Sequence, residues 1–482
     1  MLLEREVVTM PASKEVILPD ANSTTVMPKA SRQTDFQLVR VKSTWYRIKK
    51  GEAIPDAEDD ITVSQAKITE MISDGEVSWT VEAPIYFCYK VVETCHLLDP
   101  SNRTLLYGHL RNQEELETAL SRRETQRRFI VIDKTVDELY GPLVRKYFEA
   151  NYIEYKILSV PTNEETKSMD LLLDILQEVQ SFGLDRRAEP IIAIGGGVCL
   201  DIVGLAASLY RRRTPYIRVP TTLLSYVDAS VGAKNGVNFL QCKNKLGSYV
   251  PPVATFLDRA FIQTIPRQHI SNGLGEILKM ALMKHKGLLD LLKTHGKFLL
   301  DTKFQSHNGL VDHGDAALKT TRIAIEMMLE ELAPNLWEDD LNRLVDFGHL
   351  ISPELEMRAL PSLMHGEAVN VDMAFMTYVS YAKGFLSEKE KTHIIQCMTS
   401  LELPIWHKEC TWHLIKKALM ERLKHSAGQM RMPLPTGLGT ADIFNDISEE
   451  TLERAYILWT NECKTTSAEA EGSNILLQSH KE

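Results

Sequence analysis

The sequence predicts an α/β domain with a parallel sheet, followed by an all-α domain. Two observations predict this order. Between residues 76 and 266, short apolar runs alternate with helical patterns, which is typical of βαβ units. From residue 267 onward, amphipathic helical patterns replace the apolar runs. We expect the functional site to lie between the two domains.

The predicted elements of the α/β domain follow one another in regular order. Each strand is a short run rich in branched apolar residues, and each helix has apolar residues three or four positions apart. The order is strand 128–133, helix 136–150, strand 155–160, helix 167–183, strand 190–197, a further helix, and strand 216–220.

The predicted helices of the all-α domain are amphipathic. Their apolar residues form one stripe along each helix, as expected for helices that pack on a shared core. These helices cover residues 273–293, 315–331, 366–383, 388–401, 411–425 and 449–461.

The two ends of the chain lack the steady periodicity of the centre. Residues 1–75 mix Pro, Ser, Thr and charge, so we interpret them as a partly disordered extension with a weak helix around 64–72. Residues 464–482 are rich in Ser, Glu and Lys and are interpreted as a solvated tail. This leaves an α/β domain at 76–266 and a helical domain at 267–463.

The composition is that of an ordinary globular protein with an acidic surface. The chain has 482 residues, of which 44% are hydrophobic and 25% are charged. The net charge of -10 argues against nucleic acid or an anionic membrane as the main partner. We therefore expect a small-molecule partner, and an anionic substrate would need a local basic cluster.

The cysteines and the apolar runs indicate a cytoplasmic location. None of the seven cysteines has CxxC spacing, which favours unpaired thiols in a reducing compartment over disulfides or cysteine-bound zinc. The N-terminal residues have no apolar run typical of a secretory signal. The run PIIAIGGGVCL is too short to span a bilayer.

A glycine-rich turn follows the apolar strand IIAI. Gly195, Gly196 and Gly197 permit a tight turn and close approach of backbone N–H groups to a phosphate at the start of the next helix. The pattern is not GxGxxG, so a simple strand-to-helix turn explains it equally well. The arginines at 211–213 end that helix, where they either complement the helix dipole or hold a substrate phosphate.

A dense polar run follows the next predicted strand, at the end where open α/β sheets bind ligands. It offers hydroxyl, carboxylate, amine and amide groups on Thr221, Thr222, Asp228, Lys234, Lys243 and Asn244. Each of these residues alone is common in ordinary loops. The density of the run favours a binding site.

Three residues of the helical domain have the chemistry of a metal site. In the predicted helix 273–293, Glu276 and Lys279 lie off the apolar stripe, and an exposed ion pair between them is the simpler explanation. A lone histidine such as His349 or His365 is usually just hydrogen-bonded. One carboxylate and two imidazoles together form a catalytic-type zinc set, so Glu276, His349 and His365 are the candidate ligands.

Several motifs occur together in the order that a known family shows: GGGVxxD, VPTTLLxxVDxSVGxK, KN, GLGEILK, FGH and MHGEAV. Between about residues 128 and 437, the chain resembles the sugar-phosphate cyclase superfamily, whose founding member is 3-dehydroquinate synthase. The resemblance implies a Rossmann-like N-terminal domain, a helical metal-binding domain, NAD, and Zn²⁺ with Co²⁺ as a substitute. It also implies a sugar-phosphate substrate and a homodimer.

The resemblance assigns roles to the residues at matching positions. The contacts to NAD would come from Asp133, Glu164, Lys167, Gly195, Gly196, Gly197, Asp201, Thr221, Thr222, Asp228, Lys243 and Thr264. Lys234 and Lys243 would lie between cofactor and substrate. Arg212 and Asn244 would hold the substrate phosphate. Lys279 would contact the substrate beside a zinc ion on Glu276, His349 and His365.

Departures from the 3-dehydroquinate synthase pattern indicate a different substrate. Where those enzymes read NFGHxxGH, this chain has Asp346 for the asparagine and Pro353 for the second histidine. Their DKK segment is replaced by Leu423, Lys424 and His425, with Lys424 as a candidate substrate contact. The resemblance therefore implies a cyclase of sedoheptulose 7-phosphate, most like the 2-epi-5-epi-valiolone synthases, in which Asp346 and His425 are the expected pair.

The implied reaction releases phosphate and closes a ring by intramolecular aldol addition, while NAD⁺ takes up and returns a hydride. The candidate catalytic residues are Lys234, Lys279, Asp346 and His425. Alternatives within the family are a desmethyl-4-deoxygadusol or a 3-dehydroquinate synthase. Outside this family, a metal-dependent polyol dehydrogenase would accumulate NADH, and a non-catalytic scaffold would not need the metal-type residues.

Overall fold

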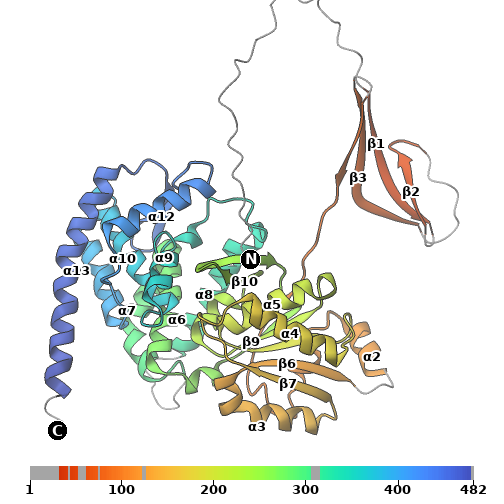
Figure 1. Ribbon diagram of the computed structural model, residues 1–482, viewed down its shortest axis with the longest axis horizontal. Helices are drawn as coiled ribbons and strands as arrows, with labels where there is room; N and C mark the ends of the chain where they lie inside the picture. The colour runs from red at the N-terminus through yellow and green to blue at the C-terminus, as the bar shows by residue number, and fades with distance from the viewer. Residues whose placement is uncertain are drawn as a thin grey trace, which may run out of the picture. The chain divides into compact units, whose positions relative to one another are not determined.

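The computed structural model describes residues 32–41, 44–52, 61–73, 76–121, 126–305 and 315–478. The chain divides into two compact units, Met1–Phe87 and Cys88–Glu482. Figure 1 shows the helices and strands of both units. Among the described helices, none has an apolar stretch long enough to cross a membrane.

The first unit contains a four-stranded antiparallel sheet in the order β2-β1-β3-β4. β1 and β2 form one hairpin, and β3 and β4 form another. β3 pairs with β1 on the side opposite β2. Their bounds are β1 (Arg32–Val41), β2 (Thr44–Lys49), β3 (Ile61–Ser73) and β4 (Glu76–Glu82).

The weak helix predicted around 64–72 is wrong, because this segment is strand β3. Ile68 and Ile72 are four residues apart, which resembles a helical stripe. In the sheet, Ile68 instead pairs with Phe36 of β1 and Val81 of β4, and such cross-strand apolar pairs stabilise a strand. The boundary predicted after residue 75 falls between two paired strands, β3 and β4. The partly disordered extension was predicted over residues 1–75, of which residues 1–31 lie outside the described residues, whereas β1, β2 and β3 lie within it.

The second unit begins with a six-stranded sheet whose neighbouring strands are all parallel, as predicted. The strand order is β5-β12-β9-β8-β6-β7. The strands are β5 (Lys90–Thr94), β6 (Arg127–Asp133), β7 (Glu154–Val160), β8 (Ile191–Gly195), β9 (Tyr216–Pro220) and β12 (Ala254–Asp258). The helices that link them are α3 (Lys134–Ala150), α4 (Met169–Phe182) and α5 (Gly197–Leu209).

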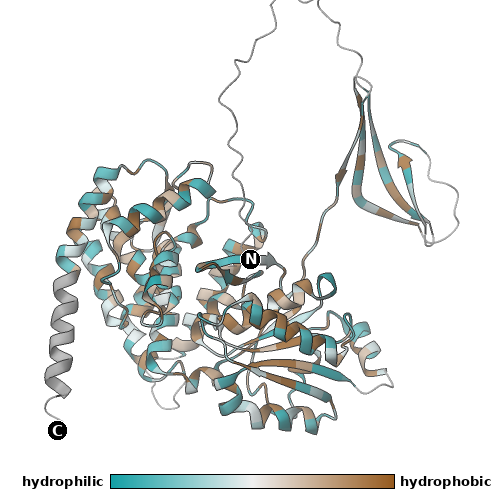
Figure 2. Cartoon of the chain, in the orientation of Figure 1, coloured by the Kyte–Doolittle hydropathy of each residue, from teal (hydrophilic) through white to brown (hydrophobic). Residues whose placement is uncertain are grey.

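Both faces of this parallel sheet are buried. Along β6, Phe129 and Val131 face a core shared with α4 and α5, whereas Ile130 and Ile132 face a core shared with α3. Because successive residues point to opposite faces, the central strands are apolar throughout, and Figure 2 shows them in brown. This two-sided burial explains why the strands appear in the sequence as continuous apolar runs.

The rest of the second unit is mainly helical, as predicted. Its large core takes side chains from almost every helix of this part. The helices are α6 (Arg267–Lys284), α7 (Lys286–Asp301), α8 (Ala316–Leu332), α9 (Ser352–Ala359), α10 (His365–Lys383), α11 (Glu388–Ser400), α12 (Trp412–His425) and α13 (Glu449–Gln478).

Two helix boundaries differ from the prediction. The single helix predicted at 273–293 is wrong, because α6 ends at Lys284 and α7 begins at Lys286. Between them His285 has a non-helical backbone, and its Nδ1 accepts a hydrogen bond from the Leu288 N–H, which caps α7. The tail predicted to begin at residue 464 starts within α13, which continues to Gln478.

The unit also contains short elements that the sequence patterns did not reveal. These are the helices α1 (Thr104–Tyr107) and α2 (Gln113–Ser121), the hairpin of β10 (Lys234–Phe239) and β11 (Cys242–Tyr249), and the hairpin of β13 (Met432–Gly437) and β14 (Thr440–Phe444). The otherwise helical C-terminal part therefore carries one β-hairpin.

A buried arginine fixes the segment that leads from β9 to the polar run. Arg218, on β9, is fully buried. Its guanidinium donates hydrogen bonds to the carbonyl oxygens of Ala229 at 3.0 Å, Gly232 at 2.7 Å and Lys234 at 2.8 Å. Because these acceptors lie in one irregular segment, a single side chain holds the backbone of Lys234 against the sheet.

Gly204 in α5 is expected to tolerate no side chain. A Cβ atom there would lie 1.7 Å from Asn235 Oδ1. That oxygen accepts hydrogen bonds from Arg218 and Tyr216, so it has no room to move. We expect Gly204→Ala to lower the free energy of unfolding by about 1–3 kcal/mol, measured by urea denaturation, although alanine normally favours a helix.

Gly141→Ala is the matched control, because it also replaces a glycine within a helix. A Cβ at Gly141 would meet only the side-chain ends of Asp137 and Arg145, which are able to rotate away. We expect this variant to be as stable as the wild type or more stable, by up to about 1 kcal/mol. Equal stability of the two variants would contradict the packing argument.

Candidate active site and metal centre

A cavity of about 830 Å³ lies where the C-terminal ends of the parallel strands meet the helical part. Its volume is within the range of small-molecule sites, roughly 300–1,000 Å³. Residues that follow β6, β7, β8 and β9 line it together with residues of α6, α9 and α10. The predicted site residues among its lining are Asp133, Glu164, Lys167, Gly196, Gly197, Asp201, Thr221, Thr222, Asp228, Lys234, Lys243, Asn244, Thr264, Lys279, Asp346, His349 and His365.

The glycine turn forms a strand-to-helix junction at this cavity. Gly195 ends β8, Gly196 is the N-cap of α5, and Gly197 is its first residue. None of the three has a positive φ, so the turn needs glycine for space and not for its backbone freedom. A Cβ at Gly195 would lie 2.6 Å from the Cβ of Cys199. The N-terminus of α5 opens on the cavity and favours an anionic group there.

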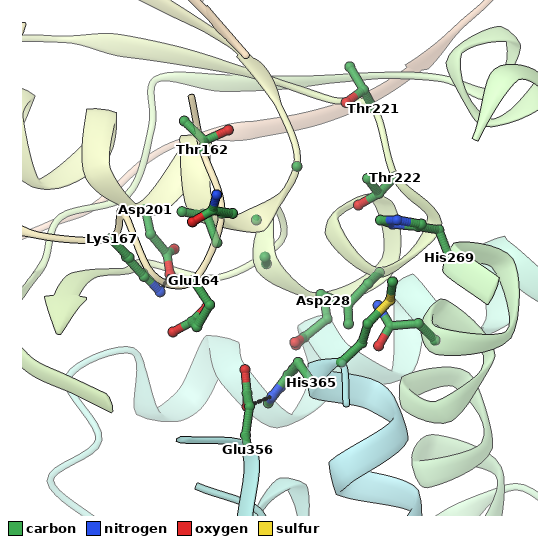
Figure 3. A pocket seen from close by; sticks show the side chains of 18 of the residues that line it. Thr162, Glu164, Lys167, Asp201, Thr221, Thr222, Asp228, His269, Glu356 and His365 are labelled. Carbon is green, nitrogen blue, oxygen red and sulfur yellow. Dashed lines mark hydrogen bonds and ion pairs between the residues drawn. The ribbon is translucent and has the colours of Figure 1, made fainter. Parts of the chain in front are cut away.

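Two carboxylates lie at the end of the cavity formed by β6 and β7. Asp133 accepts hydrogen bonds at Oδ1 from the Thr135 N–H, which caps α3, and at Oδ2 from the Thr162 hydroxyl at 2.5 Å. Glu164 accepts a hydrogen bond at Oε1 from the Asn238 amide at 2.9 Å. Figure 3 shows Thr162 and Glu164 beside the cavity. These hydrogen bonds hold both acidic side chains in place.

A buried lysine links residues to which the resemblance gave separate roles. Lys167 is 4% exposed, and its Nζ donates to Asp201 Oδ2 and to Asn244 Oδ1, both at 2.7 Å. Asp201 outweighs the effect of burial and raises the pKa of Lys167, so the amine is charged. The Asn244 amide NH₂ group is then left for another acceptor. The predicted NAD and phosphate contacts are therefore parts of one network.

The threonines and Asp228 continue the cavity wall beyond α5. Thr222 Oγ1 lies 2.8 Å from Ser225 Oγ, and Thr264 Oγ1 lies 3.0 Å from the hydroxyl of Tyr140. Asp228 belongs to a π-helical turn that follows β9. Irregular turns of this kind are frequent at functional sites.

Glu276 and Lys279 form a buried ion pair on α6. Their side chains are 1% and 3% exposed, and Lys279 Nζ lies 2.5 Å from Glu276 Oε2. Burial raises the pKa of Glu276, but Lys279 outweighs this effect and keeps the pKa below its usual value. The exposed ion pair considered from the sequence is therefore wrong. A charge pair buried to this degree costs desolvation free energy, so a simple surface role does not explain it.

Two imidazoles face the other oxygen of Glu276. Glu276 Oε1 lies 3.7 Å from His365 Nε2 and 3.9 Å from His349 Nε2, and neither distance is that of a hydrogen bond. One ligand atom from each of the three residues lies within 4.8 Å of the others. A buried carboxylate oxygen without a hydrogen-bond donor, facing two imidazole nitrogens, fits a divalent metal ion.

Both histidines are held at Nδ1, so Nε2 is the free ligand atom. His349 Nδ1 lies 3.1 Å from the Phe347 carbonyl oxygen. His365 Nδ1 lies 2.9 Å from Glu356 Oε2, an ion pair that Figure 3 marks. Partial burial and the Lys279 ammonium lower the pKa of His349, which favours the neutral, metal-binding form. These contacts are of the kind that orients metal-bound imidazoles.

Glu356 is a functional candidate that the sequence analysis missed. This carboxylate, on α9, is 3% exposed and contacts Lys243 as well as His365. Burial raises its pKa, but Lys243 and His365 outweigh that effect and keep the carboxylate ionised. The only sequence signal was an acidic residue seven positions after His349, in a short segment with a proline that was not predicted as a helix.

A chain of charged side chains runs from β10 to α12, and its members Lys234, Glu338 and Asp346 line the cavity. Lys234 Nζ lies 2.5 Å from Glu338 Oε1, and Glu338 also contacts Arg343. Arg343 lies 2.7 Å from Asp346, which in turn lies 3.2 Å from Arg422. The two arginines outweigh the effect of burial and lower the pKa of Asp346. The sequence analysis identified Lys234 and Asp346 but not the residues that join them.

Two predicted substrate residues, Arg212 and Lys424, and the predicted catalytic residue His425 do not line this cavity. Lys424 and His425, at the end of α12, have side chains 66% and 69% exposed and lie near Glu421. His425 lines a neighbouring pocket, which shares Asp346 and His349 with the main cavity. Arg212 follows α5 in a left-handed backbone conformation and lines neither pocket. Within a single chain, Arg212 and Lys424 are thus not brought to the site.

Comparison with known proteins gives the family. Residues 157–272 match the 3-dehydroquinate synthase N-terminal family, and residues 273–426 match its C-terminal counterpart. A 2-epi-5-epi-valiolone synthase of an Actinomyces species is 47% identical over 378 residues, which cover 78% of this chain and 96% of that enzyme. A demethyl-4-deoxygadusol synthase of Trichormus variabilis is 33% identical, over 72% of this chain and 84% of that enzyme.

A solved structure agrees with the sequence matches. The 2-epi-5-epi-valiolone synthase of Streptomyces hygroscopicus, with NAD⁺ and Zn²⁺ bound, superimposes with a TM-score of 0.71 and 42% sequence identity. The superposition covers 80% of this chain and 99% of that one. The chain therefore belongs to the sugar-phosphate cyclases of the 3-dehydroquinate synthase type and is most like their 2-epi-5-epi-valiolone synthases.

Proposed function

We propose that this protein converts sedoheptulose 7-phosphate to 2-epi-5-epi-valiolone with release of phosphate, using NAD⁺ and one zinc ion. One observation carries the proposal. In a chain of this family, one cavity is lined by a glycine turn at a helix N-terminus and by two oriented imidazoles, which lie beside the buried carboxylate of Glu276. The first feature suits a dinucleotide, and the second suits a catalytic metal with open coordination positions.

The strand ends would hold the cofactor. The pyrophosphate would lie at the N-terminus of α5, beside Gly196 and Gly197, and the adenosine end near Asp133 and Glu164. Lys167 would lie below the cofactor as part of the Asp201 and Asn244 network. The donors in this region are mostly backbone N–H groups and hydroxyls, which bind an anionic ligand without adding a large net charge.

The helical wall would hold the metal and the reacting sugar. Glu276, His349 and His365 would be the zinc ligands, with Lys279 Nζ against the carboxylate. When bound, NAD⁺ accepts and later returns a hydride, and zinc polarises substrate oxygens as a Lewis acid. The reaction has no net oxidation, because the hydride returns and the elements of phosphoric acid leave.

The remaining polar residues would orient the open-chain ketose. Lys234 Nζ is held by Glu338 and offers a proton donor at the cavity wall. Lys279 Nζ is charged and buried, so it would donate to a substrate hydroxyl beside the metal. Asp346, fixed between Arg343 and Arg422, would accept from a hydroxyl and so contribute to the choice of product.

The proposal includes a cytoplasmic homodimer. None of the seven cysteines, all of which lie among the described residues, forms a disulfide, which fits a reducing compartment. Arg212 lies on the surface away from the cavity of its own chain, so a role in phosphate binding would require the cavity of a second copy. A two-fold dimer would give each cavity one such arginine from its partner.

The first test is the reaction itself. We expect the purified protein, given sedoheptulose 7-phosphate, NAD⁺ and Zn²⁺, to release one phosphate per cyclitol formed, with no lasting absorbance of NADH. NMR of the product should identify 2-epi-5-epi-valiolone. A different cyclitol would assign another branch of the family, lasting NADH would indicate a dehydrogenase, and the absence of phosphate release would overturn the proposal.

His365→Ala should weaken zinc binding but leave the fold intact. The imidazole is 25% exposed at the cavity wall, so its removal leaves no large void in the core. We expect zinc affinity to fall by at least about tenfold, as for other lost contacts in zinc sites, while NAD⁺ binding and the circular dichroism spectrum stay unchanged. His413→Ala, at an exposed position of α12, is the control. Global unfolding of the His365 variant would indicate a structural metal instead.

Arg212→Ala tests the dimer. Loss of one charge-assisted bond to phosphate corresponds to about 1.5–3 kcal/mol, so kcat/KM should fall roughly 10- to 100-fold. Arg187→Ala, another exposed arginine of this surface, should be neutral. When the Arg212 and His365 variants are mixed, half of the dimers are mixed and hold one complete site, so about a quarter of the activity should return. No recovery in exchanging dimers would contradict an arginine shared between copies.

A further inference from the structure

Asp372 is a fully buried carboxylate in the middle of α10, the helix that begins with His365. Its Oδ2 accepts hydrogen bonds from two backbone N–H groups, of Ile351 at 2.6 Å and Ser352 at 3.0 Å. Its Oδ1 has no hydrogen-bond donor among the described residues. The side chain is outside the cavity lining, so a direct contact with substrate does not explain it.

The two N–H groups belong to the start of α9, where they have no acceptor within their own helix. The N-cap residue of α9, Ile351, has no side chain able to accept a hydrogen bond. Asp372 therefore supplies the cap from a different helix, and a carboxylate at this position also suits the helix dipole. Figure 1 shows α9 and α10 as neighbours.

The capped segment is the one that carries His349. On its N-terminal side, Gly348 has a φ of 74° and packs so closely on α10 that a Cβ would lie 2.6 Å from Met373 and 2.8 Å from Val369. On its C-terminal side, the Ser352 hydroxyl donates to the Gly348 carbonyl oxygen at 2.7 Å. His349 thus lies on a short loop that is attached to α10 at both ends.

The same cap also controls the second histidine through α9. This helix carries Glu356, whose carboxylate holds His365 Nδ1 at 2.9 Å. A shift of the first turn of α9 would therefore move the loop of His349 and the partner of His365 together. We propose that Asp372 is a positioning residue of the metal site, which sets the directions of both imidazoles by tying α9 to α10.

This inference rests on the proposed zinc site but concerns a residue that touches neither metal nor substrate. Burial raises the pKa of Asp372 to about 6, although the backbone N–H groups oppose that rise. The ionised carboxylate is therefore less favourable for folding at neutral pH than the protonated one. Its hydrogen bonds to the Ile351 and Ser352 N–H groups nevertheless contribute stability that a side chain without an acceptor would lose.

The test compares zinc affinity with stability. Asp372→Leu fills the same space but removes the acceptor, so we expect zinc affinity, measured by chelator competition, to fall at least about tenfold. The visible spectrum of the Co²⁺-loaded protein should change because a displaced imidazole alters the coordination. In EDTA the leucine variant should unfold at a lower temperature than the wild type, because the Ile351 and Ser352 N–H groups lose their acceptor, but it should remain fully folded at the temperature of the zinc measurement.

Two further variants complete the test. Asp372→Asn keeps an acceptor oxygen and should retain zinc affinity and the Co²⁺ spectrum. Ser380→Ala removes another buried polar group of α10, distant from α9, and should change neither. Should the leucine variant fail to fold, Asp372→Ser is measured instead, because its hydroxyl is too short to reach both N–H groups, and the same loss of affinity is expected.

The outcomes separate this inference from the proposed function. A leucine or serine variant with wild-type zinc affinity and Co²⁺ spectrum would overturn the positioning role. A metal-free leucine or serine variant that is partly unfolded at the temperature of the zinc measurement, and that regains wild-type zinc affinity when it is folded at a lower temperature, would also overturn it, in favour of a structural role. A wild-type protein that binds no zinc would instead contradict the proposed function on which the inference rests.

Discussion

The buried ion pair between Glu276 and Lys279 is the constraint on which the site depends. Two charges removed from water cost several kcal/mol each, and their mutual attraction offsets that cost only when the geometry is good. The pair occupies one oxygen of the carboxylate, at 2.5 Å, and leaves the other facing His349 and His365. A divalent ion at that oxygen would satisfy the remaining lone pairs, so the metal and the ion pair support each other.

The two sides of the cavity present different kinds of groups to a ligand. The sheet side offers helix N-termini and backbone groups at the strand ends, where the chain itself supplies the donors. The helical side relies on side chains that are each held by another, as Glu356 holds His365 and Lys243. An acidic protein thereby presents lysines to an anionic substrate in a local network, although its net charge is -10.

Much of the fold was predictable because the strongest patterns of apolar residues in the sequence arise from burial in the core. The parallel strands are buried on both faces, and the longer helices repeat apolar residues at helical spacing. The spacing of apolar residues gave a wrong prediction where pairing with other strands determines the structure. Ile68 and Ile72 fit a helix by spacing, but pairing with neighbouring strands makes the segment β3. At His285, a change of direction divides an apolar stripe that is continuous in the sequence.

The site residues were predictable where the resemblance to the family included whole motifs. They were harder to predict where a residue acts through contacts with side chains of other helices or strands. Glu276, His349 and His365 come together as expected, yet no spacing in the sequence requires it. Glu356 was missed because its partners, Lys243 and His365, lie far from it along the chain or on another helix. Lys424 was expected at the substrate but pairs with Glu421 on its own exposed helix surface.

The chain is also longer than its relatives, which bears on where the activity resides. About 80% of this chain accounts for 99% of the solved 2-epi-5-epi-valiolone synthase. Every residue that lines the cavity lies in the second unit, Cys88–Glu482. The sheet of the first unit shares no residue with that cavity, and it exposes apolar side chains such as Trp79 and Val81. The cavity, the metal-type residues and their supports therefore all belong to the second unit.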